Sequence, residues 1–185
     1  SIGILNSLAR CAADSGDIMR ATKALEEVVK LDPRNLYALR RLRDFRIKES
    51  LWSDAADLQK KIVDSEKDET SRKKEKRLLT GLLFESASRA CSDGKLSDAL
   101  IKLKEVLRND DAFMPAHVLL GDVLARQGNI LNAIKVWEKA RVKFPKSEAL
   151  MLRLEDIYIS ESAPERILEK YKKEGVEFVR LDDSY

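Results

Sequence analysis

The sequence has few of the residues from which metal sites, disulfide scaffolds and turn-rich folds are built. Its 185 residues include one histidine, two cysteines, seven glycines and four prolines. The two cysteines, Cys11 and Cys91, are eighty residues apart in the sequence. With a single histidine, they cannot supply a structural zinc site of the Cys and His type or a disulfide framework. We therefore expect no metal site and no cofactor.

The sequence also has no large excess of charge of one sign and no long apolar run. The 35 lysines and arginines nearly balance the 32 aspartates and glutamates. This balance argues against a protein that binds nucleic acid or a membrane surface through a strong positive charge. No stretch approaches the roughly 20 apolar residues of a membrane-spanning helix, and the first residues do not resemble a signal peptide. We expect a soluble, cytoplasmic protein. The first residue is not Met, which favours a piece of a longer protein.

The chain is rich in Leu, Ala, Glu, Lys and Arg, and it repeats. Small residues that would let two helices approach recur at intervals of 34, 44 and 34 residues, at Ala21, Ala55, Ala99 and Ala133. A turn marker recurs at the same phase: Gly16, Ser50, Gly94 and Gly128. These spacings indicate an all-α protein with a 34-residue repeat and ten extra residues inserted once.

The fourth unit carries the fullest motif. Its first half contains His117-x2-Leu120-Gly121-x2-Leu124, and its second half contains Ala133-x3-Trp137, Ala140 and Pro145. With the 34-residue period, this pattern resembles the tetratricopeptide repeat (TPR). The resemblance implies a right-handed superhelix, an α-solenoid of antiparallel helix pairs with about five repeats.

The phases predict one solenoid domain over residues 1–185. Its repeats are 2–35, 36–69, 80–113, 114–147 and 148–181, with a charged insertion at 70–79. Ten helices are expected, at 2–15, 18–31, 35–49, 52–64, 70–92, 96–109, 114–127, 130–143, 147–160 and 163–173. Asp32-Pro33 and Phe144-Pro145 should end two of them. The second unit departs from the pattern, since Arg43 and Arg46 replace small or apolar residues.

The segment from Asp64 to Arg77 has charges of both signs and neither Gly nor Pro. This composition favours a solvated loop followed by one or two extra turns on the next helix. The alternative is a basic docking patch at Arg72, Lys73 and Lys74.

No catalytic constellation is present in the sequence. His117 falls at a core position, Cys11 is expected to pack as a small hydrophobe, and Cys91 is expected near the groove. Glycine-rich phosphate loops and hydrolase motifs are absent. We expect a protein that is not an enzyme.

The TPR resemblance implies a partner-binding concave groove lined by the first helix of each pair. Counting the corresponding phases gives the candidate residues Asn6, Arg10, Tyr37, Arg40, Asp44, Lys48, Phe84, Ser88, Asp122, Arg126 and Asp156. Arg can pair with carboxylates, and Tyr and Phe offer anchoring area. The expected partner is a peptide or helix of another protein. The lysine and asparagine clamp of chaperone-tail modules is not reproduced.

Two stretches, Ala38 to Val63 and His117 to Pro145, are similar to the lipopolysaccharide assembly protein B family of bacteria. That resemblance implies an adaptor in the regulation of lipopolysaccharide synthesis, at the cytoplasmic face of the inner membrane through an anchor that these residues do not contain.

Two other functions remain open: an RNA-binding helical repeat, since pentatricopeptide repeats have a similar period, and a module that positions a larger enzyme. The apolar residues Ile2, Leu5 and Leu8, and the segment from Val176 to Leu181, also predict weak homodimers through exposed solenoid ends.

Overall fold

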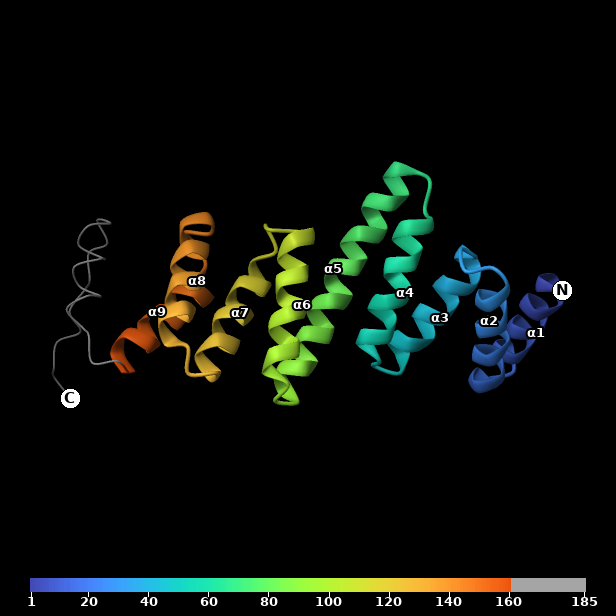
Figure 1. Cartoon of the computed structure of the whole chain (residues 1–185), viewed down its shortest axis with the longest axis horizontal. Coiled ribbons are helices and arrows are strands. Elements are labelled where there is room, and N and C mark those ends of the chain that lie inside the picture. Colours follow the sequence, from blue (N-terminus) through green and yellow to red (C-terminus); the bar gives the residue numbers. More distant parts are fainter. Residues whose placement is uncertain (161–185) are drawn as a thin grey trace. The chain divides into compact units, whose positions relative to one another are not determined.

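The computed structural model describes residues 1–160, and every regular element in that part of the chain is an α-helix (Figure 1). The helices are α1 (Ile2–Asp14), α2 (Ile18–Leu31), α3 (Leu36–Lys48), α4 (Trp52–Ser65), α5 (Glu69–Ser92), α6 (Leu96–Asn109), α7 (Met114–Arg126), α8 (Ile130–Lys143) and α9 (Glu148–Ser160). Each lies within two residues of its predicted limits, so the first nine predicted helices are confirmed. The tenth, at 163–173, lies outside the described residues.

Residues 1–116 form one compact unit and residues from 117 onward form a second. In the first unit, α1 packs on α2, α3 on α4, and α5 on α6. Its core at the N-terminal end is formed by Ala21, Leu25, Val28 and Phe45 with their neighbours. In the second unit, the buried residues Ala133, Trp137, Leu150 and Leu154 form a separate cluster. Small residues at the repeat phases are thus fully buried, as predicted.

The turn inside each described helix pair has the expected left-handed residue. Gly16, Gly94 and Gly128 have φ angles of +79°, +75° and +77°, which glycine adopts without steric cost. Ser50 occupies the same position with φ +57° and is the one non-glycine residue among the described positions in this conformation. The prolines also act as predicted, because α2 ends at Leu31 and α8 ends at Lys143.

The charged insertion is almost entirely helical. Only residues 66–68 separate α4 from α5, and α5 is 24 residues long whereas its neighbours α4 and α6 each have 14. Asp68 begins α5 by accepting a hydrogen bond from the Ser71 backbone N–H at 2.7 Å. The first turns of α5 therefore project beyond α6 (Figure 1). The predicted extension of this helix is confirmed, although the loop before it is short.

Two smaller predictions about cysteine are wrong. Cys11 is exposed rather than packed, because its position on α1 faces away from α2. Cys91 is buried, with 6% of its surface exposed, in the segment of α5 that packs on α6. His117 is half-buried and stacks at a tilt against Phe144, with ring centroids 5.7 Å apart.

Candidate functional site

Three of the predicted groove residues, from two different repeats, lie around one surface cavity. Asn6 and Arg10 of α1 and Tyr37 of α3 line it together with Ser7, and its volume is about 310 Å³. Asn6 and Arg10 are four residues apart and therefore share one face of α1. Tyr37 stands in the first turn of α3, with 44% of its surface exposed. We call these four residues the N-terminal cavity.

Asn6 gives this cavity an unsatisfied hydrogen-bonding group. Its Oδ1 atom is buried and has no hydrogen-bond partner, and it is the one side-chain atom of this kind among the described residues. Buried polar atoms are nearly always paired in folded proteins, since an unpaired one costs about 1–3 kcal/mol. Asn6 therefore carries an unpaired acceptor beside the cavity that its own side chain helps to line.

Arg40 and Asp44, also predicted for the groove, are held in ion pairs within the protein. Arg40 Nη2 lies 2.9 Å from Glu66 Oε2 and 2.8 Å from Glu75 Oε1. Asp44 accepts two hydrogen bonds from its neighbour Arg43, at 2.9 and 2.7 Å. Arg40 therefore joins α3 to Glu75 of α5, whereas the pair of Asp44 with Arg43 lies within α3.

The centre of this cluster is the pair Gln59 and Glu75. Gln59 is fully buried, accepts a hydrogen bond from Arg43 Nη1 at 2.8 Å, and donates to Glu75 Oε2 at 2.7 Å. Burial alone would raise the pKa of Glu75. Hydrogen bonds from Gln59 and Arg40, with the charges of Arg40 and Arg43, outweigh burial and hold the pKa of Glu75 below its ordinary value.

We call Arg40, Arg43, Gln59, Glu66 and Glu75 the polar network. In the sequence, Arg43 stands out only as a departure from the repeat pattern. Its charge at a small-residue position was the one signal that could have pointed to the network.

Phe84, Ser88 and Lys48 lie apart from the N-terminal cavity. Phe84 is half-buried and meets Phe113 edge to face, with ring centroids 5.2 Å apart. Ser88 is half-buried on α5, and its backbone oxygen accepts a hydrogen bond from Ser92. Lys48 is exposed at the last residue of α3.

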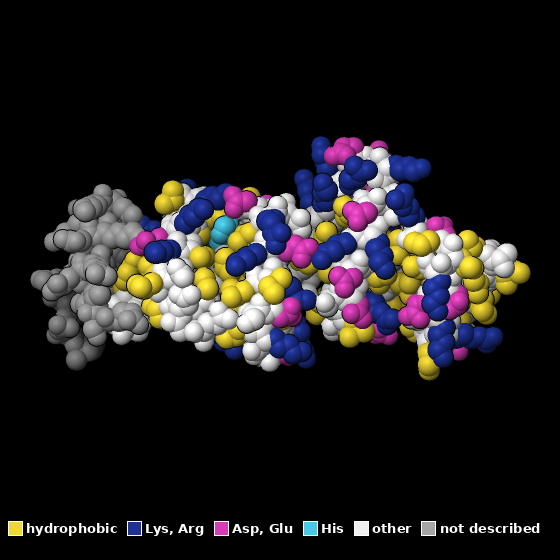
Figure 2. Space-filling model, in the orientation of Figure 1, with side chains coloured by type: hydrophobic (Ala, Val, Ile, Leu, Met, Phe, Trp, Pro, Cys, Tyr) yellow, Lys and Arg dark blue, Asp and Glu magenta, His cyan; other side chains and the backbone are white. Residues whose placement is uncertain are grey.

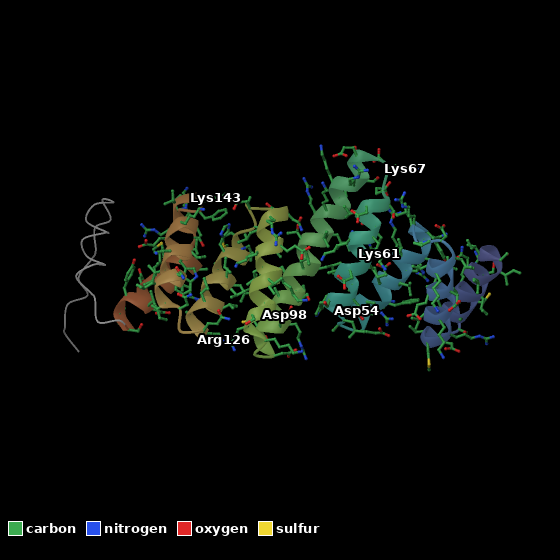
Figure 3. All side chains as sticks on the ribbon, viewed as in Figure 1. Asp54, Lys61, Lys67, Asp98, Arg126 and Lys143 are labelled. Carbon is green, nitrogen blue, oxygen red and sulfur yellow. The ribbon has the colours of Figure 1, made fainter. Side chains whose placement is uncertain are left out.

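The remaining candidates belong to the second unit. Asp122 of α7 accepts two hydrogen bonds from Arg153 of α9, at 2.7 and 3.2 Å. This bond raises the pKa of Arg153, and the charge of Asp156 contributes further. Arg126 is exposed at the C-terminal end of α7 (Figure 3).

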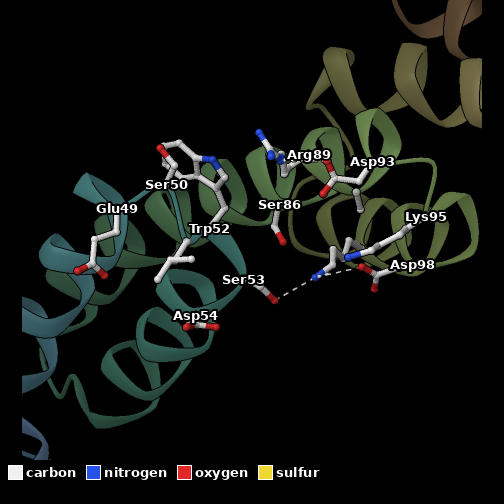
Figure 4. A pocket seen from close by; sticks show the side chains of 13 residues that line it. Glu49, Ser50, Trp52, Ser53, Asp54, Ser86, Arg89, Asp93, Lys95 and Asp98 are labelled. Atoms are coloured by element: carbon white, nitrogen blue, oxygen red, sulfur yellow. Dashed lines mark hydrogen bonds and ion pairs between the residues drawn. The ribbon is translucent and has the colours of Figure 1, made fainter.

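A larger cavity was not anticipated from the sequence. Its volume is about 510 Å³, and Figure 4 shows it where the α3–α4 turn faces the end of α5 and the start of α6. Trp52 forms part of its wall, and Lys102 bridges its floor by contacts to Ser53 Oγ at 3.1 Å and Asp98 at 3.7 Å. Its residues come from the α3–α4 turn, the last turns of α5 and the first turns of α6, all outside the predicted groove phases, so the repeat pattern gave no signal for them.

Within residues 1–160, no group of three or more histidine, cysteine or acidic side chains is arranged to hold a metal ion. None of the described helices has the length and apolar character to cross a membrane.

Comparison with known proteins identifies the fold. No family model matches the chain, and no curated protein matches it. Two crystal structures of MamA are similar, with TM-scores of 0.55 and 0.54 at 20% and 19% identity. The matches cover 90% of this chain and 91% of the first MamA chain, and 96% and 97% for the second. A tetratricopeptide repeat protein from Parabacteroides merdae has a TM-score of 0.52 at 18% identity, covering 94% of this chain and 66% of that one. The chain thus has an all-α fold of the TPR solenoid type.

Proposed function

We propose that this protein is a non-catalytic scaffold that binds a peptide or helix of a partner protein at the N-terminal cavity. The observation that carries the proposal is that Asn6, Arg10 and Tyr37 line one cavity. The repeat phase alone predicts these residues, and they come from two separate repeats. TPR-type helix pairs provide surfaces for recognition, and the sequence offers no catalytic groups.

The cavity has the chemistry of a peptide site. The exposed guanidinium of Arg10 can pair with a carboxylate of the partner through two parallel hydrogen bonds. Tyr37 offers an exposed ring on which an apolar side chain can pack. Asn6 adds a polar side chain to the wall of the cavity, beside Arg10 on the same face of α1. The site therefore favours a segment that carries an acidic and an apolar side chain.

Affinity capture with the double variant Arg10→Ala and Tyr37→Ala tests this proposal. Loss of two contacts of this kind is expected to weaken capture of the partner by about tenfold or more. The matched control changes Arg108→Ala and Ile101→Ala, an exposed arginine and an exposed large apolar side chain of α6, a helix that carries no predicted groove residue. Capture that is equal for wild type and the cavity variant would refute the proposal.

The narrower role in lipopolysaccharide regulation, at the inner membrane, rests on the sequence resemblance over residues 38–63 and 117–145. It extends the scaffold proposal to one partner class. The sequence of the parent gene tests it: paired C-x2-C motifs downstream and an apolar segment upstream would support it, and their absence would remove it. Retention of RNA at low ionic strength would favour the alternative of an RNA-binding repeat.

Self-association through α1 is a further part of the proposal. Of the residues predicted for this end, Leu8 is exposed, whereas Ile2 and Leu5 are partly buried against the core. Ile4 lies four residues before Leu8 on α1, and 69% and 36% of their surfaces are exposed. An unpaired apolar stripe of this kind favours contact with a second copy. Light scattering at high concentration should give a mass above that of the monomer, and a monomeric mass would contradict this. The segment from Val176 to Leu181 lies outside the described residues.

A further inference from the structure

The projecting turns of α5 separate charges that alternate in the sequence. Glu75 points into the polar network, where Arg40, Arg43 and Gln59 contact it. Glu66 is paired with Arg40, so two acids of the segment are neutralised inside the protein.

Arg72 is also used within the protein. Its guanidinium donates to the Glu66 carbonyl oxygen at 3.0 and 2.6 Å, which satisfies the residue that ends α4. It also lies 3.5 Å from Glu69. Arg72 was predicted as part of a basic docking patch, but its guanidinium is bound within the protein and stabilises the connection between α4 and α5.

The cations that remain face outward. Lys73, Lys74, Lys76 and Arg77 are all exposed, and none of them forms a salt bridge with a residue that the structure describes. Lys73 and Arg77 are four residues apart and lie opposite the inward-facing Glu75, while Lys74 and Lys76 lie roughly 100° to either side of Glu75, so the four cover the outward half of the helix. We call these four residues the basic face of α5.

Dark blue side chains gather at the projecting end of α5 in Figure 2, and Lys67 lies at the same end in Figure 3. The exposed acids nearby are Asp64, Asp68 and Glu69. Asp68 caps α5 and Glu69 contacts Arg72, so both are partly committed, and Asp68 also lies within electrostatic range of Lys74 without forming a salt bridge to it.

We propose that the basic face of α5 binds an acidic segment of a partner protein, one rich in Asp and Glu. The proposal rests on the scaffold function and adds a second contact to it. Cations that their own protein leaves unpaired attract carboxylates and steer their approach. The polar network holds the projecting turns in place, because Glu75 ties them to α3 and α4.

Other anionic partners fit this surface less well. No aromatic residue occurs between residues 60 and 78, so bases of a single strand would find no ring on which to stack. The four cations span about 6 Å of helix axis, which is short for tracking a nucleic-acid backbone. Leu78 is the one exposed large apolar side chain beside them in the described structure, so little is available to insert into a lipid surface. A carboxylate-rich segment requires no aromatic ring, no long basic track and no apolar insertion.

The test measures binding of a fluorescently labelled glutamate-rich peptide to the full chain, with the glutamine counterpart of the peptide as reference. One variant carries Lys73→Glu, Lys74→Glu and Arg77→Glu. Its matched control carries Lys23→Glu, Lys135→Glu and Lys139→Glu, which are exposed lysines elsewhere with the same total change in charge. The peptide is expected to bind the first variant about tenfold or more weakly and the control within about twofold of wild type. Higher salt should weaken binding to wild type more than to the first variant.

Three results would overturn the inference: equal weakening in both variants, no preference for glutamate over glutamine, or tighter binding to phosphatidylserine vesicles or single-stranded RNA than to the peptide. The variant Arg10→Ala and Tyr37→Ala separates this inference from the scaffold proposal. It should keep the glutamate peptide while losing the partner captured at the N-terminal cavity. If the peptide is lost with this variant and kept by the basic-face variant, the inference fails and the proposed function stands.

Discussion

At the scale of single residues, two helical glycines have opposite surroundings. A Cβ atom on Gly121 would stand 2.0 Å from Trp137 Nε1, far inside contact distance. Trp137 is itself fixed, since Nε1 donates to the Val118 carbonyl oxygen at 3.1 Å. A Cβ atom on Gly81 would meet nothing within 4 Å. The same change of one methyl group should therefore have opposite effects at the two positions.

We expect Gly121→Ala to lower the free energy of unfolding by about 1–3 kcal/mol, because the added atom displaces the indole. Gly81→Ala should raise it by roughly 0.5–1 kcal/mol, because alanine loses less backbone entropy in a helix. Urea denaturation followed by circular dichroism measures both. Similar values for the two variants would show that Trp137 does not pack on Gly121 as described.

Ser50 provides a second test at this scale. It has φ +57° at a turn position where the other described units have glycine. The left-handed conformation costs a non-glycine residue about 1–2 kcal/mol. Glycine avoids this cost, but it also gives the unfolded chain more conformational entropy, which offsets part of the gain in stability. Ser50→Gly should therefore stabilise the first unit by up to about 1 kcal/mol in thermal or urea unfolding. Gly94→Ser is the reciprocal variant and should destabilise it. A stabilising effect of the reciprocal variant would contradict this account.

At the scale of helices, the polar network makes the packing of α3, α4 and α5 sensitive to acid. The lowered pKa of Glu75 means that the folded protein binds a proton there less readily than the unfolded chain does. Its contribution to stability is therefore complete above the ordinary pKa near 4.5 and is lost as the pH falls through the lower folded value.

Glu75→Gln should lower stability at neutral pH by about 1–3 kcal/mol, since Arg40 and Arg43 lose their shared carboxylate. The variant should also lose less stability than wild type on acidification below about pH 4.5. Urea unfolding at several pH values measures both effects. Glu85→Gln, an exposed change on the same helix, is the control and should stay within about 0.5 kcal/mol of wild type. An acid profile identical to wild type would rule out this role of Glu75.

Helices were the part of this structure that the sequence predicted best. Ala21 and its counterparts are small for a steric reason that acts within one pair of helices, and Pro33 ends a helix through its own backbone. The sequence did not reveal that Glu75 faces inward while Lys74 and Lys76 face outward. Both signs alternate along the chain, and only packing against α3 and α4 decides which sign is buried. The pairing of Arg40 with Glu75 depends on residues 35 apart, which no local pattern encodes.

At the scale of the whole molecule, the chain consists of two compact units, residues 1–116 and residues from 117 onward. In helical repeat proteins, stability is a sum of local terms and contacts with nearest neighbours. Damage to the centre of one unit should therefore stay mainly within it.

Trp137→Ala tests this expectation, because the indole is 2% exposed at the centre of the second unit. Its removal should cost about 3–5 kcal/mol locally. Hydrogen exchange should show faster exchange in α8 and α9 and unchanged protection in α1 to α4. Faster exchange throughout residues 1–116 would instead indicate one cooperative molecule.

The chain has two tryptophans, and the unit boundary separates them. Trp52 is half-buried at the cavity beside the α3–α4 turn, whereas Trp137 is enclosed against Gly121. Each unit therefore contains its own intrinsic fluorophore. With Trp52→Phe, the emission reports the second unit alone, and with Trp137→Phe it reports the first. A change in the environment of Trp52 on adding a ligand would give an optical signal from this protein without any attached label.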